Sequence, residues 1–182
     1  ITRGGDFSPF FRSNALVIDW KQNGACVKEY ILKVYPYLNG NYGWKIQDEN
    51  YYEKPGITWG KRNERFNAQV MPAGHIFTDE GQGIVPNCLS ESMFLLGYLN
   101  SSFVSYFLSL TSGLQKHYVY IRPIPIAVNE TRTRNAIANL ASRIVTIKKR
   151  WDATSELSPQ FSPAQVFSGA PRTALSDLTR FI

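Results

Sequence analysis

Cysteine and histidine are scarce in this chain of 182 residues, which contains two of each. Cys26 and Cys88 stand alone, with no CxxC spacing and no pair of histidines nearby. A structural zinc site needs such clusters, and a disulfide framework needs a larger set of paired cysteines. The sequence therefore predicts no metal site, no disulfide framework and a reducing, cytoplasmic setting.

Motifs of the common catalytic classes are also missing. The chain has no GxxxxGK phosphate loop, no HExxH zinc motif and no glycine-rich turn after a strand that would hold a nucleotide-like cofactor. The Asp/Asn-Pro-Pro-aromatic motif that grips an extruded base is absent, and Tyr35-Pro36-Tyr37 is its nearest approach. His75 and His117 have no carboxylate or cysteine at a triad-like spacing. We therefore expect no catalytic residue and no cofactor site in this chain.

One short motif suggests a metal-dependent nuclease as an alternative. Asp19-Trp20-Lys21 follows the β-favouring run Ala15–Ile18 and imitates the D-x-K end of a nuclease core, with Asp6 as an upstream carboxylate. Three residues recur often by chance. The Asn23-Gly24 turn that follows favours a simpler interpretation, in which Lys21 is a solvated residue at the end of a strand.

Long charged or apolar runs do not dominate the chain either. Lys and Arg number 20 against 14 Asp and Glu, so the net charge of +6 favours polyanionic partners without requiring one.

Met93–Leu110 has the length of a membrane span, but Asn100, Ser101 and Ser102 lie at its middle, where polar groups are costly in lipid. We expect a helix in a soluble core and no membrane partner. The chain opens at Ile1 rather than Met and shows no basic-then-apolar leader, which predicts a piece excised from a longer protein rather than a secreted precursor.

The first 86 residues read as short strands separated by turns. A hairpin turn is expected at Asn23-Gly24 between two strands, and the predicted strands are Ala15–Ile18, Val27–Val34, Ile57–Trp59, Phe66–Val70, Ile76–Thr78 and Ile84–Val85. Gly, Pro and Asn at the boundaries supply turns that strands cannot continue through. This pattern predicts a mixed or antiparallel sheet rather than a βαβ repeat.

The pattern after Pro86 is more helical. We expect one buried helix at Met93–Leu110, a short strand at Tyr118–Ile121, a second helix at about Thr131–Trp151 and a short helix near Thr173–Phe181. On the second helix an apolar seam of coiled-coil spacing, which predicts packing along another helix, consists of Ile137, Leu140, Ile144 and Ile147. The predicted class is α+β, with a strand-rich mixed sheet and two main helices. Its expected divisions are a body at 1–126, an amphipathic helix at 127–151 and an extended Ser/Pro-rich segment at 152–182.

Aromatic, amide and cationic side chains cluster between Tyr51 and Asn67. Arg and Lys can donate to guanine edges or phosphates, and Asn can bond adenine edges, so a loop with these residues can contact DNA. The same composition also suits a solvated loop whose aromatic side chains belong to the core. Composition alone leaves both interpretations open.

The order of several short motifs resembles a known family. The motifs are Gly56-Ile57-Thr58-Trp59, Phe66, Pro72-Ala73-Gly74-His75-Ile76-Phe77, Gly81-Gln82-Gly83-Ile84-Val85-Pro86 and Leu95-Leu96-Gly97-Tyr98-Leu99-Asn100-Ser101. This succession resembles the C-terminal recognition region of large adenine methyltransferases of the BREX phage-defence type (PglX) and of fused restriction-modification enzymes. The Leu-Asn-Ser helix followed by Ile124-Pro125-Ile126 also resembles the end of recognition domains in type I specificity subunits. Ile144–Trp151 and Asp152-Ala153 resemble the segment that follows in BREX-type enzymes.

The resemblance implies a target-recognition domain that reads double-stranded DNA. The catalytic domain of the same parent chain would be its partner and would use S-adenosylmethionine. Conserved motif residues would be structural: Trp59 and Phe77 in the core, Gly74, Gly81 and Gly83 in turns, and Asn100 bonding nearby backbone. The predicted DNA-contacting residues are Lys54, Lys61, Arg62, Asn63, Arg65, Asn67, Lys116 and His117.

A second function from another class remains open. In this alternative the chain is a docking module, and the seam Ile137–Ile147 binds another subunit of a defence complex. DNA binding through cations must weaken steeply with salt, whereas docking through an apolar seam is nearly indifferent to salt.

Overall fold

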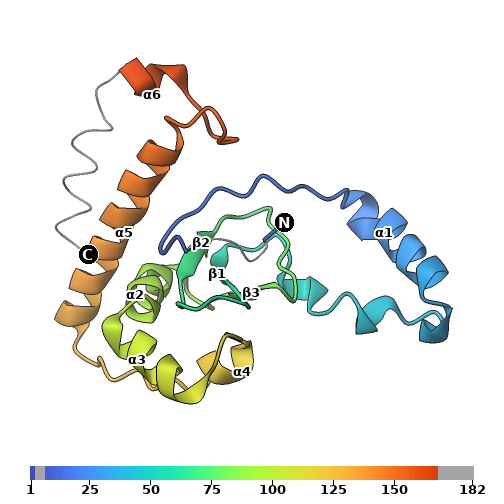
Figure 1. The fold of residues 1–182 in the computed structure, drawn as a ribbon, viewed down its shortest axis with the longest axis horizontal. Helices are drawn as coiled ribbons and strands as arrows, with labels where there is room; N and C mark the ends of the chain where they lie inside the picture. The colour runs from blue at the N-terminus through green and yellow to red at the C-terminus, as the bar shows by residue number, and fades with distance from the viewer. Residues whose placement is uncertain (3–6, 168–182) are drawn as a thin grey trace.

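A small antiparallel sheet and several helices make up the fold in the computed structural model, which describes residues 1–2 and 7–167 (Figure 1). The strands are β1 (Gly56–Gly60), β2 (Ala68–Met71) and β3 (Gly81–Ile84). The helices are α1 (Lys21–Val34), α2 (Leu89–Leu99), α3 (Ser102–Thr111), α4 (Tyr118–Ile121), α5 (Thr131–Asp152) and α6 (Pro163–Phe167). Short 3-10 turns lie at Pro36–Leu38, Tyr42–Trp44 and Glu49–Tyr51. The predicted α+β class is confirmed, but the sheet is much smaller than the strand-rich body we expected.

The sheet has β1 in its centre, and both neighbours run antiparallel to it in the order β2-β1-β3. The predicted strand at Ile57–Trp59 is therefore confirmed. Trp59 lies opposite Ala68 on one side and Gln82 on the other. Because directly opposed residues of antiparallel strands share a face, the buried side chains of Ile57, Trp59 and Ala68 form one apolar face, which packs in the core with α2.

The outer edge of β2 is covered by two segments that are distant in sequence. The Phe10 N–H donates to the Ala68 carbonyl at 2.7 Å, and the Val70 N–H donates to the Phe10 carbonyl at 3.0 Å. The Asn100 carboxamide then imitates another strand, because its Oδ1 accepts from the Ala68 N–H and its Nδ2 donates to the Ala68 carbonyl, both at 2.9 Å. These bonds leave Ala68 with no unsatisfied backbone group. The predicted bond to nearby backbone is the one from Asn100 Nδ2 to the Leu96 carbonyl at 2.9 Å, whereas Asn100 lies between two helices rather than within one and its bonds to Ala68 reach across 32 residues.

The long helix α5 confirms the predicted helix and packs along α2 (Figure 1). The two helices approach closely at Gly97, where an added Cβ would lie 2.6 Å from Ile137 Cγ2 and 3.4 Å from Ala141 Cβ. Ala141 and Val145 are buried in this contact. The helix partner predicted for α5 therefore lies within the chain, and the packed face is rotated from the predicted seam, since Leu140 is 41% exposed.

The predicted single helix Met93–Leu110 is instead two helices, with a bend of 59° between Glu91–Leu99 and Ser102–Thr111. The break falls at Asn100, whose side chain is committed to β2, and at Ser101, whose Oγ accepts from the Val104 N–H at the start of α3. Among the described residues no single helix is long and apolar enough to cross a membrane. The two helices of the bent pair reach the necessary length and apolar composition only when they are taken together.

The N-terminal strand prediction is wrong, because Val27–Val34 belongs to α1. Its apolar residues Val27, Ile31 and Val34 recur at the helical spacing i, i+4 and i+7, which we misjudged as an extended run. A turn does occur at Asn23-Gly24, where both residues have positive φ angles of 57° and 71°. It leads into a helix rather than a second strand.

Several shorter predictions also need correction. Ala15–Ile18 and Ile76–Thr78 are not strands, and Tyr118–Ile121 is the helix α4, which the His117 side chain caps. Gly83 lies within β3 rather than in a turn. Gly81 begins β3 but also closes a turn, because it is bonded to Thr78 in both directions, and Gly74 has a positive φ of 78° as a turn requires. Val85 lies beyond β3, and β2 begins at Ala68 rather than Phe66.

The nuclease alternative loses the strand on which it depended. Asp19 instead accepts a hydrogen bond from the Lys21 N–H at 3.2 Å where α1 begins. Asp6, like the predicted helix Thr173–Phe181, falls outside the described residues. The divisions at residues 126 and 151 stay predictions.

Candidate nucleic-acid interface

The segment Lys61–Arg65, which we call the basic loop, follows β1 directly and is held by backbone hydrogen bonds on both sides. The Lys61 N–H donates to the Glu80 carbonyl at 2.9 Å, and the Lys61 carbonyl accepts from the Lys116 N–H at 2.6 Å. The Asn63 N–H donates to the Leu114 carbonyl at 3.2 Å. The basic loop therefore presents its side chains from a fixed backbone.

This arrangement joins two groups of predicted contact residues that are far apart in sequence. Arg62 forms an antiparallel bridge with Gln115, so the backbone of residues 114–116 runs beside the basic loop. The Trp59 indole N–H donates to the Lys116 carbonyl at 2.7 Å and ties the second segment to β1. The basic loop and residues 114–117 form one surface.

Two arginines of the basic loop extend toward solvent. The Arg62 side chain is 67% exposed. Arg65 is exposed too, and its guanidinium lies 4.3 Å from the centre of the Phe7 ring, a cation–π contact that leaves its N–H groups able to donate elsewhere. Arg62 and Arg65 therefore have the exposure that contact with a large polyanion needs. Asn63 is only half-exposed.

A tight turn at Thr78–Gly81, which we call the acidic turn, faces the basic loop. Asp79 Oδ2 lies 2.6 Å from Lys61 Nζ, and Glu80 Oε1 lies 3.7 Å from the Arg62 guanidinium. The hydrogen bond from Lys61 holds the pKa of the Asp79 carboxyl below its usual value. The first two cations of the basic loop are therefore paired with carboxylates.

Two of the predicted contact residues are buried. Lys116 is 4% exposed, and its Nζ donates to Ser112 Oγ at 3.2 Å and to the Gly113 carbonyl. Burial lowers the pKa of the Lys116 ammonium. Asn67 is 2% exposed because it immediately precedes β2 and points inward, where its Oδ1 accepts from Gln69 at 3.4 Å. Neither side chain reaches the surface, so neither can contact DNA in this structure.

The other two predicted residues lie in different places. His117 is beside the basic loop, with its ring centre 4.4 Å from that of Tyr118 and its Nδ1 3.5 Å from the Val119 N–H. Lys54 is exposed ahead of β1, and its Nζ lies 5.4 Å from the centre of the Tyr51 ring. His117 can belong to the same surface as the basic loop, whereas no contact joins Lys54 to it.

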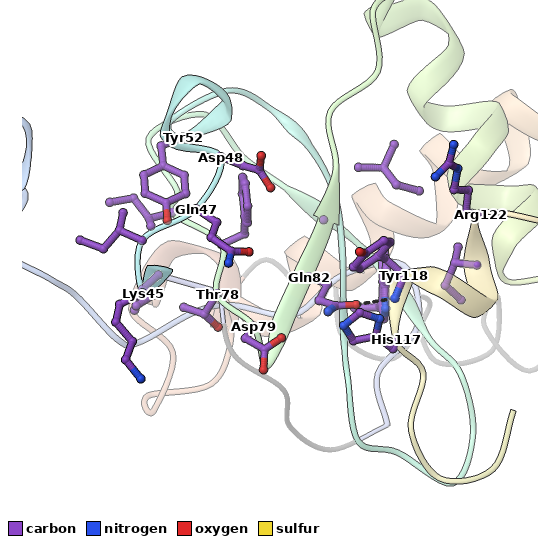
Figure 2. Close-up of a pocket in the computed structure, with 18 of the residues that line it drawn as sticks. Lys45, Gln47, Asp48, Tyr52, Thr78, Asp79, Gln82, His117, Tyr118 and Arg122 are labelled. Atoms are coloured by element: carbon purple, nitrogen blue, oxygen red, sulfur yellow. Dashed lines mark hydrogen bonds between the residues drawn. The ribbon is translucent and has the colours of Figure 1, made fainter. Parts of the chain in front are cut away.

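A groove of 1060 Å³ runs along β3 beside this surface (Figure 2). One wall comes from residues 44–52 and the other from residues 117–126, and Figure 2 shows Tyr52 and Asp48 across β3 from His117 and Tyr118. Gln82 joins β3 to the second wall, because its Oε1 accepts from the Tyr118 N–H at 2.7 Å. Asp79 and His117 line the groove as well as flanking the basic loop.

The wall opposite α4 is aromatic. The Tyr52 ring packs edge-on against Trp20 at 5.3 Å and against Phe77 at 5.0 Å between ring centres. Burial raises the pKa of the Tyr52 hydroxyl to about 12, so this group stays protonated at neutral pH. Phe77, which we expected in the core, is only half-buried and lines the groove.

Sequence reasoning missed the acidic turn and the groove. The signal for the turn was present, because Asp79-Glu80-Gly81 is an acidic pair followed by glycine between two predicted strands. Nothing in the sequence placed it opposite the basic loop. Among residues 1–2 and 7–167, no three His, Cys, Asp or Glu side chains lie together in a way that could hold a metal ion.

Comparison with known proteins points to one kind of enzyme. An adenine-specific methyltransferase PglX from Lacticaseibacillus casei (strain Zhang) is 31% identical over 115 residues. This chain is similar to part of that methyltransferase. The match covers 60% of this chain and 9% of the methyltransferase, so the chain spans a small fraction of the relative's length. No family model matches the chain.

Proposed function

We propose that this chain is a target-recognition domain of an adenine-specific DNA methyltransferase of the BREX or restriction-modification type, and that it binds double-stranded DNA. Its similarity to 9% of a PglX methyltransferase supports a specialised part of such an enzyme. In this proposal the transfer of a methyl group from S-adenosylmethionine belongs to a catalytic domain outside the chain. The described strands are antiparallel and provide no βαβ unit that fits such a cofactor.

The basic loop carries the proposal. Its backbone is bonded to residue 80 on one side and to residues 114–116 on the other, while Arg62 and Arg65 remain exposed. Specific recognition requires side chains that are held in register, because a displaced donor cannot form a bidentate contact with a base edge. We infer that Arg62 reads a base and that Arg65 contacts either a base or a phosphate.

We also propose that the elements of this domain are arranged like those of the recognition domains in type I specificity subunits. In support, Asn100 ends α2 with its side chain fastened to β2, and the Ile124-Pro125-Ile126 segment then leads to α5. The Tyr98 hydroxyl fixes this connection by donating to the Pro125 carbonyl at 2.6 Å. The sheet, α2 and α5 would form the constant frame, and the basic loop would vary with the sequence read.

Substitution in the basic loop tests the function. The target sequence is first identified by mapping methylated adenines in DNA exposed to the parent enzyme. Arg62→Ala is then expected to weaken binding to that sequence by about 1–3 kcal/mol, while binding to random duplex changes less. Arg132→Ala, an exposed arginine at the start of α5, is the matched control. Equal losses on target and random DNA, or no loss on either, would contradict the assignment.

The docking function remains a second candidate because part of the α5 seam is uncovered. Of the seam residues, Leu140 is 41% exposed, and Ile144 and Ile147 are half-buried. Trp151, one turn beyond the seam, is 46% exposed. Helix α5 has 22 residues against 11 in α2, so its C-terminal half extends beyond its partner (Figure 1). Sedimentation of the chain with the rest of the parent protein tests it: a Leu140→Glu/Trp151→Glu variant should lose an association that is indifferent to salt.

A further inference from the structure

The acidic turn places two carboxylates directly against the first two cations of the basic loop. Two hydrogen bonds close the turn, one in each direction between the backbone groups of Thr78 and Gly81, both at 3.2 Å. Asp79 and Glu80 therefore occupy its tip. The Lys61 N–H bonds the Glu80 carbonyl at 2.9 Å, so the turn and the basic loop are held in register.

The two ion pairs differ in accessibility. The Lys61 side chain is 13% exposed, whereas that of its partner Asp79 is 70% exposed. In the second pair, Arg62 is 67% and Glu80 is 45% exposed. A polyanion that approaches Lys61 therefore meets the exposed carboxylate of Asp79 first, whereas Arg62 is the more exposed member of its pair and is only partly neutralised by Glu80. Exposed ion pairs contribute little to stability, so their value to the fold is small.

We propose that Asp79 and Glu80 are specificity-determining residues that suppress binding to non-target DNA. This inference rests on the proposed function and deepens it. A phosphate must displace the Asp79 carboxylate to reach Lys61, and a phosphate at Arg62 is repelled by the neighbouring Glu80 carboxylate. At a target site, base contacts of the basic loop compensate for the two ion pairs, whereas at a random site no such contacts form.

The lowered pKa of Asp79 agrees with this geometry, because it keeps the carboxylate charged beside Lys61 at neutral pH. The hydrogen bond from Lys61 is the main cause of this lowered pKa, and His117, on the same side, contributes in the same direction. Non-specific DNA binding depends on the number of cations that are able to neutralise phosphates. Pairing Lys61 and Arg62 lowers that number without removing the donors that read bases.

The test uses the full chain and a fluorescein-labelled duplex of 20 base pairs with random sequence. Asp79→Asn/Glu80→Gln keeps the size of both side chains and removes both charges. We expect roughly tenfold tighter binding to this duplex at low salt, and a log–log salt dependence steeper by about two, because two cations are released to bind phosphates. The ratio of target to random affinity should fall.

A matched control separates local pairing from net charge. Glu29→Gln/Glu156→Gln removes two exposed carboxylates on other elements of the fold and gives the same net charge. If both double variants bind random duplex equally well, or if Asp79→Asn/Glu80→Gln binds no more tightly than the wild type, the inference is overturned. Glu80→Gln alone, which leaves the Lys61–Asp79 pair intact, should give a smaller gain in the same direction.

The outcome is distinguishable from failure of the proposed function. A wild-type parent enzyme without any sequence preference would refute target recognition, even if the amide variants gained affinity for random duplex. A wild type that prefers its target, combined with amide variants whose random-duplex binding is unchanged, would refute only the role of the acidic turn. Equal melting temperatures for all variants verify that the fold is intact.

Discussion

The frame of this protein, defined as β1, β2, α2 and α5, and the basic loop are stabilised in opposite ways. In the frame, side chains are buried and backbone groups are bonded by distant residues, as Asn100 shows at Ala68. In the basic loop the backbone is held by hydrogen bonds, while the side chains of Arg62 and Arg65 remain exposed. Substitutions in the frame should therefore change stability, and substitutions in the basic loop should change binding.

The largest effect is expected at the contact between α2 and α5. Gly97→Val places methyl groups where even a Cβ would lie 2.6 Å from Ile137 Cγ2, and the Ile137 backbone carbonyl at 3.3 Å prevents easy relaxation. Overpacking of this kind should cost about 3 kcal/mol of unfolding free energy. Thermal unfolding should then show a midpoint lower by roughly 6–12 °C. Gly113→Val, where a Cβ meets no atom within 4 Å, is the control.

A smaller loss is expected when the edge of β2 is uncovered. Asn100→Ala leaves the Ala68 N–H without its acceptor, which should cost about 1–3 kcal/mol. Amide hydrogen exchange at Ala68 should accelerate more than exchange at Thr58 on β1. Asn139→Ala on the exposed side of α5 serves as the comparison. Unchanged protection at Ala68 would mean that Asn100 does not protect this N–H.

The pH dependence of stability tests a third contact of the frame. Burial lowers the pKa of Lys148 to about 8, and its Nζ donates to Ser8 Oγ at 2.8 Å and to the Pro9 carbonyl at 2.7 Å. The pKa of an unfolded lysine is about 10.4. Between pH 8 and this value the unfolded chain binds more protons than the folded chain, so the free energy of unfolding rises with pH.

The variant Lys148→Met lacks this proton. The difference in unfolding free energy, wild type minus variant, should therefore increase from pH 8 to 10 in denaturant titrations. Tyrosines and other lysines titrate in both proteins and cancel from the difference. A flat or decreasing difference would show that Lys148 is not desolvated.

The smallest change in stability is expected in the basic loop itself. Arg65→Ala removes an exposed cation–π contact with Phe7 and should alter the unfolding free energy by no more than about 1 kcal/mol. The same substitution should weaken DNA binding measurably in anisotropy titrations. A large loss of stability without loss of binding would reverse the distinction between the frame and the basic loop.

Prediction from sequence succeeded where one periodicity dominated. β1 has a run of strand-favouring residues, and α5 has a long helical period with cations off its apolar side, so both were identified. α1 was misassigned because an Asn-Gly turn usually joins strands, and its short apolar run fits either period. The break at Asn100 could not be foreseen, because its cause is a hydrogen bond to a strand 32 residues earlier.

The candidate site was only partly predictable for a similar reason. Lys61, Arg62, Asn63 and Arg65 were recognisable as cations and amides between strands. Their burial and pairing depend on tertiary contacts, so the sequence could not show that Asn67 and Lys116 point inward or that Asp79 faces Lys61. Residue type identifies what a side chain is able to bind, whereas the fold decides whether it is accessible.

The segment that covers β2 also sets an order of events during synthesis. Residues 8–13 are held by α5 as well as by β2. Lys148 Nζ donates to Ser8 Oγ, and Ser13 Oγ donates to Asp152 Oδ1 at 3.0 Å. Lys148 leaves the ribosome 140 residues after Ser8, which at about 5–20 residues per second corresponds to roughly 7–28 s. Throughout that interval residues 8–13 lack their second anchor, so this segment can be held at both β2 and α5 only after α5 has emerged.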